Sequence, residues 1–246
     1  MLMKRSLAFL FGVCFILCIS LPAFSLPLEK SFTKTDEGVL IYPVYNLSGN
    51  TSVVRIQVLT DKIIRVTSSP DSIIPAKKSL IAENNTLSKN WTVVKQAERV
   101  LVKTPVLTAS VSLSTGAVSF VDKNGTPVVM ERQNNGREFR PAVFEGQPSY
   151  NITQTFETTA DDAYYGLGQH QDDQFNYKGR QVFLFQNNTE VAVPFLISKK
   201  NYGILWDNYS LTKIWRCKRL YASLNLKAVF ERRRLWLADC LIQQRS

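Results

Sequence analysis

Paired carboxylates are the first feature of the sequence that could do chemistry. Asp161 is followed by Asp162, and Asp172 is followed by Asp173. Two carboxyl groups can hydrolyse a glycosidic bond when one attacks the sugar and the other protonates the leaving oxygen. Neighbouring residues of an extended chain, however, point to opposite sides. We therefore interpret both pairs as solvated loop acids, and we expect no catalytic residue in this chain.

The single histidine, His170, limits the other kinds of catalysis. A serine–histidine–acid triad would need it as the base, but no G-x-S-x-G elbow occurs and its neighbours are glutamines and aspartates. One histidine also excludes a histidine-rich zinc site. Gly166 and Gly168 supply only half of a G-x-G-x-x-G nucleotide fingerprint, and no helix is predicted after them. We expect neither a metal nor a cofactor.

The stretch 164–180 is the part of the sequence richest in side chains that could bind a ligand. It mixes aromatic, amide and charged residues around glycines. Sugars present apolar C–H faces and hydroxyl groups, so a saccharide site needs aromatic platforms beside hydrogen-bonding groups. The alternative is a hairpin whose aromatic rings pack on a sheet. Both interpretations stay open for Phe175, Asn176 and Lys178, whereas packing is favoured for the two tyrosines that open the stretch.

The elements that must position this stretch are β-strands. Between residues 26 and 212 there is no convincing amphipathic helix, and short runs rich in Val, Ile, Thr and aromatic residues alternate with turn residues. Strands this short and frequent are typical of an antiparallel β-sandwich, in which each sheet buries one face against the other. The more polar segment 132–162 is predicted to be a long connection with at most one strand, near 152–158. The other predicted strands are 54–58, 63–67, 91–95, 99–103, 106–113, 117–122, 127–131, 182–186, 191–197 and 203–206.

The first 25 residues have the pattern of a signal peptide. Lys4 and Arg5 precede an almost wholly apolar run over 7–21, and small residues mark a cleavage site predicted after Ser25. A membrane anchor is the alternative, but about 15 apolar residues fall short of the roughly 20 that a spanning helix needs. We therefore expect export to the periplasm or the cell exterior, with no stable membrane span after cleavage.

The formal net charge of +10 is concentrated near the two ends of the chain. Residues 213–246 carry nine Lys and Arg against two acids, a net of +7, and the two basic residues before the apolar run add +2. The rest of the chain carries only +1, which argues against a nucleic-acid partner for the main body. The body from 26 to 212 also has no cysteine, so it must fold without disulfides.

Four blocks of sequence resemble glycoside hydrolase family 31, most closely the exported bacterial α-xylosidase type. Their order and spacing make the resemblance specific, and it extends over roughly 30–212, more weakly before 131. The blocks are Tyr-Tyr-Gly-Leu-Gly-Gln-His-Gln (164–171), Asn-Tyr-Lys-Gly (176–179), Val-Ala-Val-Pro-Phe (191–195) and Asn-Tyr-Gly-Ile-Leu-Trp-Asp-Asn (201–208).

The resemblance implies that residues 26–213 are the N-terminal β-sandwich domain of such an enzyme, of the galactose-mutarotase-like type. In the family this domain packs against a (β/α)₈ barrel, which carries both catalytic aspartates of a retaining hydrolase and takes about 250 residues by itself. The sandwich sends a loop, here 169–178, to the edge of the substrate pocket. The residues that the resemblance implies would contact the sugar are Gln169, His170, Asp172, Asp173, Phe175, Asn176 and Lys178.

The chain is therefore expected to be a truncated N-terminal domain of an exported α-glycosidase, acting in carbohydrate metabolism on α-xylosides or α-glucosides and inactive by itself. A saccharide would be bound weakly at most, because most of the pocket would come from the barrel. The alternative function is a stand-alone carbohydrate-binding β-sandwich module, which would need an intact sandwich and measurable sugar affinity.

Residues 214–246 do not resemble the family. From 215 onward they contain six arginines and two cysteines but neither Gly nor Pro. The tail can be back-translated with freely chosen codons, and the resulting DNA, read one nucleotide later, can encode a sequence similar to the family's continuation. We therefore hypothesise a frameshift near Ile214 with an early stop after Ser246. A basic amphipathic helix over 217–237 is the alternative. A frameshifted tail would leave the sandwich incomplete at its C-terminal end, and the unpaired edge predicts poor solubility.

Overall fold

The computed structural model describes residues 31–74, 79–81, 87–171, 173–216, 223–229 and 238–244. Within these residues the chain forms antiparallel strands in two sheets, with one short 3-10 helix at Tyr45–Leu47 and no α-helix. The predicted all-β, antiparallel fold class is confirmed. No helix among the described residues is long and apolar enough to cross a membrane.

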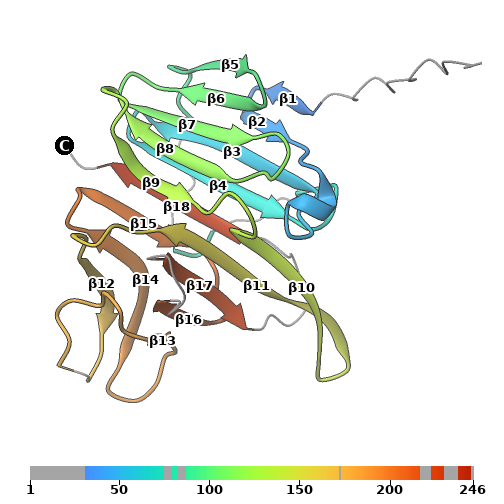
Figure 1. Cartoon of the computed structure of the whole chain (residues 1–246). Helices are drawn as coiled ribbons and strands as arrows, with labels where there is room; N and C mark the ends of the chain where they lie inside the picture. The colour runs from blue at the N-terminus through green and yellow to red at the C-terminus, as the bar shows by residue number, and fades with distance from the viewer. Residues whose placement is uncertain are drawn as a thin grey trace, which may run out of the picture.

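The first sheet, which we call sheet A, has eight strands. Their spatial order is β1–β2–β3–β4–β18–β15–β14–β12 (Figure 1). All neighbouring strands pair antiparallel. The bounds are β1 (Phe32–Thr35), β2 (Gly38–Ile41), β3 (Val53–Thr60), β4 (Ile63–Ser69), β12 (Tyr164–Gln169), β14 (Val191–Ser198), β15 (Tyr202–Trp206) and β18 (Ala238–Gln244).

The second sheet, sheet B, has ten strands. Nine follow the order β13–β16–β17–β11–β9–β8–β7–β6–β5, and β10 pairs with β11 beside this path. The bounds are β5 (Thr92–Gln96), β6 (Arg99–Lys103), β7 (Leu107–Ser112), β8 (Val118–Asp122), β9 (Pro127–Glu131), β10 (Arg137–Phe144), β11 (Gln147–Glu157), β13 (Val182–Leu184), β16 (Leu211–Arg216) and β17 (Ser223–Val229).

The core lies between the sheets and is built by alternate residues of the strands. Ile56 of sheet A and Phe120 of sheet B are each at most 2% exposed and belong to the same buried cluster. Along β6, Val100 and Val102 are buried, whereas Leu101 between them is only half-buried. The period of two in the sequence therefore decides which side chains enter the core, because successive residues of a strand face opposite sides.

Most predicted strands are confirmed, but the prediction for the segment 132–162 must be corrected. The predictions 99–103 and 127–131 coincide with β6 and β9, and the other predicted strands outside this segment differ by at most two residues at an end. The predicted long connection is wrong, because β10 and β11 form a hairpin there. Its strands are rich in polar side chains, so they lack the apolar alternation by which the other strands were found.

A buried ion pair fastens the start of this hairpin to the core. Arg137 Nη2 donates to Glu131 Oε2 at 2.7 Å, and the two side chains are 2% and 1% exposed. The same Glu131 oxygen accepts the Val118 N–H at 2.9 Å. Burial raises the pKa of Glu131, while Arg137 and the Val118 N–H counteract part of that rise. The pair holds the β9 end and the β10 start together across the intervening turn.

Two strands of the segment 214–246 lie inside the sheets. β17 pairs with β11 and β16, and β18 pairs with β4 and β15; Figure 1 shows β18 in red beside β4. This arrangement differs from the expected sandwich without its last strands, and the strand Ser223–Val229 contradicts the helix considered for 217–237. The frameshift stays a prediction, and the predicted signal peptide lies outside the described residues.

Candidate functional site

The site predicted from the sequence begins at a β-bulge in β12. The residues Gly166, Leu167 and Gly168 all have positive φ, at 97°, 66° and 101°, and the pairing of β12 with β14 shifts between the two glycines. A Cβ on Gly168 would overlap the carbonyl oxygen of Val191, so only glycine fits there. The bulge turns Leu167 into the core, where it is 1% exposed. The two glycines therefore serve a bulge.

Asp162 is the buried anchor at the entry to β12. Its Oδ1 accepts hydrogen bonds from Ser198 Oγ at 2.7 Å and from the Ala163 N–H at 2.8 Å. Its Oδ2 accepts from the hydroxyls of Tyr164 at 3.0 Å and Tyr202 at 3.5 Å. Burial and the nearby carboxylate raise the pKa of Tyr202 to about 12, and burial is also the first cause that raises the pKa of Tyr164. Both phenols therefore stay protonated donors at neutral pH.

The loop after β12 is tied back onto this anchor by its own amide and lysine. Asn176 Oδ1 accepts the N–H groups of Tyr164 at 3.1 Å and Lys178 at 3.0 Å, and the Tyr177 N–H donates to Tyr164 O at 2.9 Å. The Lys178 ammonium donates to the carbonyls of Thr159, at 3.0 Å, and Ala160. Asn176 and Lys178, both predicted to contact a sugar, therefore fix the position of the loop against β12 and the turn before it.

His170 is also held inside the site. Its side chain is 5% exposed, and its Nε2 lies 2.9 Å from Leu167 O. A carbonyl oxygen can only accept, so Nε2 carries the proton in this contact. Its Nδ1 lies 3.8 Å from Glu190 Oε2, and its ring meets the Tyr177 ring edge-on. The histidine joins the bulge, the loop after β12 and the turn before β14.

The exposed members of the predicted set are Gln169, Asp173, Phe175 and Asn176, the last of which is already bonded to Tyr164 and Lys178. Phe175 is 84% exposed, and its ring centroid lies 5.1 Å from that of the half-buried Tyr165. Asp173 has a positive φ of 50° and an exposed side chain. Asp172 lies outside the described residues. The structure thus brings an aromatic ring, an amide and a carboxylate to the open side of one loop.

The interpretation of Asp161 and Asp162 as solvated loop acids is right for the first and wrong for the second. Asp161 is 67% exposed; a hydrogen bond from Thr159 Oγ1 at 2.6 Å and one from Lys200 lower its pKa to about 2. Asp162 is 5% exposed and serves as the anchor described above. Its main partner, Ser198, lies 36 residues further along the chain, so no local sequence pattern could have revealed this role.

The outer face of β12, β14 and β15 is apolar, which is unusual for an uncovered sheet face. Core-side residues of these strands are buried, among them Leu196 and Ile204. The residues paired on the opposite side are also apolar but remain half-buried or exposed. Gly203 lies under the Phe195 ring, and a Cβ there would come within 2.7 Å of Phe195 Cζ. We call this surface the outer face; its residues are Tyr165, Phe175, Val191, Val193, Phe195, Ile197 and Leu205.

Within the described residues, His, Cys, Asp and Glu side chains do not gather in groups of three or more that could hold a metal ion. The site thus consists of an apolar sheet face with a braced, partly aromatic loop at its rim. Such a surface can pack against another domain and can touch a ligand held at that boundary.

Comparison with known families identifies the domain. The pattern of the glycosyl hydrolase 31 N-terminal galactose mutarotase-like domain matches residues 53–214, which include most strands of both sheets and the loop after β12. The chain belongs to glycoside hydrolase family 31. The predicted resemblance and the predicted galactose-mutarotase-like sandwich are both confirmed.

Curated relatives of this family 31 domain include two glycosidases. An alpha-xylosidase from Saccharolobus solfataricus is 36% identical over 117 residues, which are 44% of this chain and 15% of the relative. An uncharacterized family 31 glucosidase from Pseudescherichia vulneris is 34% identical over 95 residues, which are 39% of this chain and 17% of the relative. The matched parts are thus less than a fifth of either relative.

Solved structures of the family share the fold. The GH31 alpha-xylosidase from Xanthomonas citri superposes with a TM-score of 0.68 at 41% identity, over 74% of this chain and 19% of that protein. A GH31 alpha-xylosidase from a soil metagenome, complexed with xylose, gives a TM-score of 0.70 at 20% identity, over 87% of this chain and 32% of that protein. The second likeness concerns the fold alone.

Proposed function

We propose that this chain is the N-terminal domain of an exported α-glycosidase of the α-xylosidase or α-glucosidase type. In this proposal the outer face packs against a catalytic barrel, and the loop 169–178 lines the edge of the substrate pocket. The observation that carries the proposal is the apolar outer face with a braced loop at its rim. Family membership and the alpha-xylosidase relatives support the choice of reaction class.

The outer face supports a covering domain because of its chemistry. An antiparallel sheet that faces water on one side normally alternates apolar and polar residues. Here Val193, Phe195 and Ile197 continue the apolar pattern on the side away from the core. At roughly 25 cal/mol per Å² of apolar surface, covering such a patch would be a strong driving force for docking.

The braced loop supports a contact with substrate at its tip rather than along its length. Asn176, Lys178 and His170 make the internal contacts that fix its shape. Phe175 and Gln169, by contrast, are exposed. We infer that Phe175 offers the platform for a sugar ring, while Asn176, Lys178 and His170 preorganise the loop.

Hydrolysis itself is assigned to the rest of the protein. Asp161 and Asp162 are bound to different partners, an exposed lysine and a group of buried hydroxyls, so they do not share a pocket as the two carboxyl groups of a glycosidase must.

The exposed Phe175 also favours a second candidate, a stand-alone carbohydrate-binding module. Calorimetric titration of the chain with xylose, glucose and xyloglucan fragments separates the two functions. The proposed domain predicts dissociation constants weaker than about 1 mM, because a loop tip makes few contacts. Tighter binding that is lost in Phe175→Ala would favour the module, and hydrolysis of an aryl α-xyloside by the purified chain would contradict both.

A further inference from the structure

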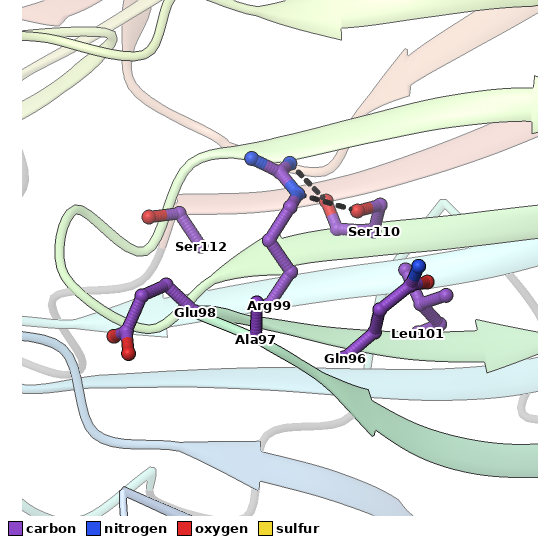
Figure 2. Close-up of a pocket in the computed structure, with 7 residues that line it drawn as sticks. All are labelled: Gln96, Ala97, Glu98, Arg99, Leu101, Ser110 and Ser112. Atoms are coloured by element: carbon purple, nitrogen blue, oxygen red, sulfur yellow. Dashed lines mark hydrogen bonds between the residues drawn. The ribbon is translucent and has the colours of Figure 1, made fainter.

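An open pocket lies at the turn between β5 and β6, at the opposite end of the molecule from β12 (Figure 1). It has a volume of about 540 Å³, within the range of pockets that hold small ligands. Its lining residues are Gln96, Ala97, Glu98, Arg99, Leu101, Ser110 and Ser112 (Figure 2).

The pocket arises from the pairing of large side chains with small ones. Arg99 pairs with Ser112 across β6 and β7, and Leu101 pairs with Ser110. Because the serines are short, the sheet surface is hollow beside the arginine. Ala97 has a positive φ of 48° in the turn. Figure 2 shows the Glu98 carboxylate turned away from the Arg99 guanidinium.

Arg99 stands in the middle of the pocket with neutral partners. Its Nε donates to Ser110 Oγ at 2.6 Å, and its Nη2 donates to Ser110 O and Ser119 Oγ, each at 3.0 Å. Its Nη1 donates to Gln133 Oε1 at 3.2 Å. No carboxylate pairs with Arg99 among the ion pairs of the described residues. Desolvation lowers its pKa, as expected for a cation that lacks a counter-charge.

These groups match the chemistry of a sugar that carries a carboxylate. A guanidinium has five N–H groups, so one on Nη1 remains for an acceptor. Ser110 Oγ accepts from Arg99 and keeps its own proton to donate, and Gln96 adds an exposed amide. Leu101 supplies an apolar wall for a ring C–H face.

We propose that this pocket binds an acidic monosaccharide, of the uronic acid class, through a charge-assisted contact between its carboxylate and Arg99. The pocket is separate from the loop after β12, so the proposal does not rest on the proposed function. This pocket would let the sandwich bind a polysaccharide that contains uronic acids.

The test is a titration of the full chain, followed by NMR or calorimetry, with glucuronate, glucose and acetate as probes. We expect glucuronate to bind at least about 10-fold more tightly than either of the other two, because only it offers both the charge and the ring hydroxyls. If acetate binds as tightly as glucuronate, the ligand need not be a sugar, and this part of the proposal is overturned. If glucose binds as tightly as glucuronate, the carboxylate contact with Arg99 is overturned. Absence of glucuronate binding up to about 10 mM would overturn the site itself.

Three variants make the test specific. Arg99→Gln is expected to weaken glucuronate binding at least about 10-fold, whereas Lys103→Gln, which removes the same charge from an exposed position on the same strand, should leave it unchanged. Since Arg99 also links β6 to β8 and could affect folding, Glu98→Gln provides the second measurement. Removing this acid should tighten glucuronate binding about 2-fold and leave glucose unchanged. An unchanged glucuronate affinity in Glu98→Gln or in a folded Arg99→Gln would contradict the proposal.

Discussion

The two ends of the sandwich use the same alternation of residues but differ on their outer sides. Along β6–β8 the residues opposite the core are mainly polar, as with Lys103, Ser110 and Ser119. Along β14 the residues opposite the core are Val193, Phe195 and Ile197. The first end has a surface suited to water, and the second has a surface suited to cover by protein. This difference is the physical basis of the proposed docking.

The strands of the C-terminal segment join the two ends. Without β18, sheet A would separate into β1–β4 and β12–β15, because β4 and β15 are connected through β18. Without β17, sheet B would separate at β11 and β16. The segment with no family resemblance therefore occupies the seam between the polar end and the apolar end.

Removing β17 and β18, the strands at this seam, should have the largest effect on stability. A chain that ends after Arg216 loses both strands and the backbone hydrogen bonds on either side of each. We expect it to show no cooperative unfolding transition, since the loss is comparable with the whole stability of about 5–15 kcal/mol of an ordinary domain. Thermal unfolding followed by circular dichroism checks this.

The matched control is a chain that lacks β1, an edge strand paired on one side only. It should still unfold cooperatively. If the chain ending after Arg216 unfolds as sharply as the full chain, the seam carries no stability, and the predicted frameshift near Ile214 gains support.

Glu131, beside β8, and Asp162, before β12, are both buried carboxylates, and the two should respond differently to the loss of their interactions. Arg137→Met leaves Glu131 buried without its cation and is expected to cost about 3–5 kcal/mol. Asp162→Asn should cost about 1–3 kcal/mol. The side-chain partners of Asp162 are neutral hydroxyls, so no buried charge is left unpaired, but the new NH2 group would point at groups that donate to the carboxylate. Urea unfolding of both variants measures the difference.

The double variant Glu131→Leu with Arg137→Met is the control for the first substitution. It should recover part of the loss, because it removes the unpaired charge. A larger cost for Asp162→Asn than for Arg137→Met would reverse the comparison.

Alkaline pH should lower the stability of the fold through Tyr202 at the apolar end. The pKa of Tyr202 is raised from 10.0 to about 12, so its stabilising effect is complete below pH 10 and is lost as the pH rises through 12. The two pKa units correspond to about 3 kcal/mol. The free energy of unfolding, measured at about pH 9, 10, 11 and 12, follows this loss. Tyr202→Phe should show a shallower decline, and an identical decline in that variant would count against the assignment.

Substitution on the outer face should have the smallest effect on stability. Val193 is 42% exposed, so Val193→Ser should change the free energy of unfolding by less than about 0.5 kcal/mol while it reduces self-association. Leu196→Ala, on the core side of the same strand, should cost about 2–5 kcal/mol. Sedimentation and urea unfolding separate the two responses. Equal stability losses at both positions would mean that the outer face is already covered.

Much of this arrangement could be predicted from the sequence, and the exceptions have physical causes. Strands such as β6 and β9 follow apolar alternation, which burial of one sheet face imposes. β10 and β11 do not, since many of their side chains are polar and the pairing is made by backbone groups. Asp162 was misjudged because its partner Ser198 lies 36 residues away, and no local pattern reveals such a contact. The loop after β12 was located correctly, but the internal contacts of Asn176 and Lys178 depend on how it folds back.

The most direct measurement is complementation. The chain is mixed with the α-xylosidase of Xanthomonas citri from which the matching N-terminal part has been removed, and hydrolysis of an aryl α-xyloside is followed. That enzyme's own N-terminal part serves as the positive control, and Val193→Asp in this chain serves as the negative one. The account predicts that the mixture hydrolyses the substrate, that neither component does so alone, and that Val193→Asp abolishes the gain. Hydrolysis by this chain alone, or an inactive mixture beside an active positive control, would contradict it.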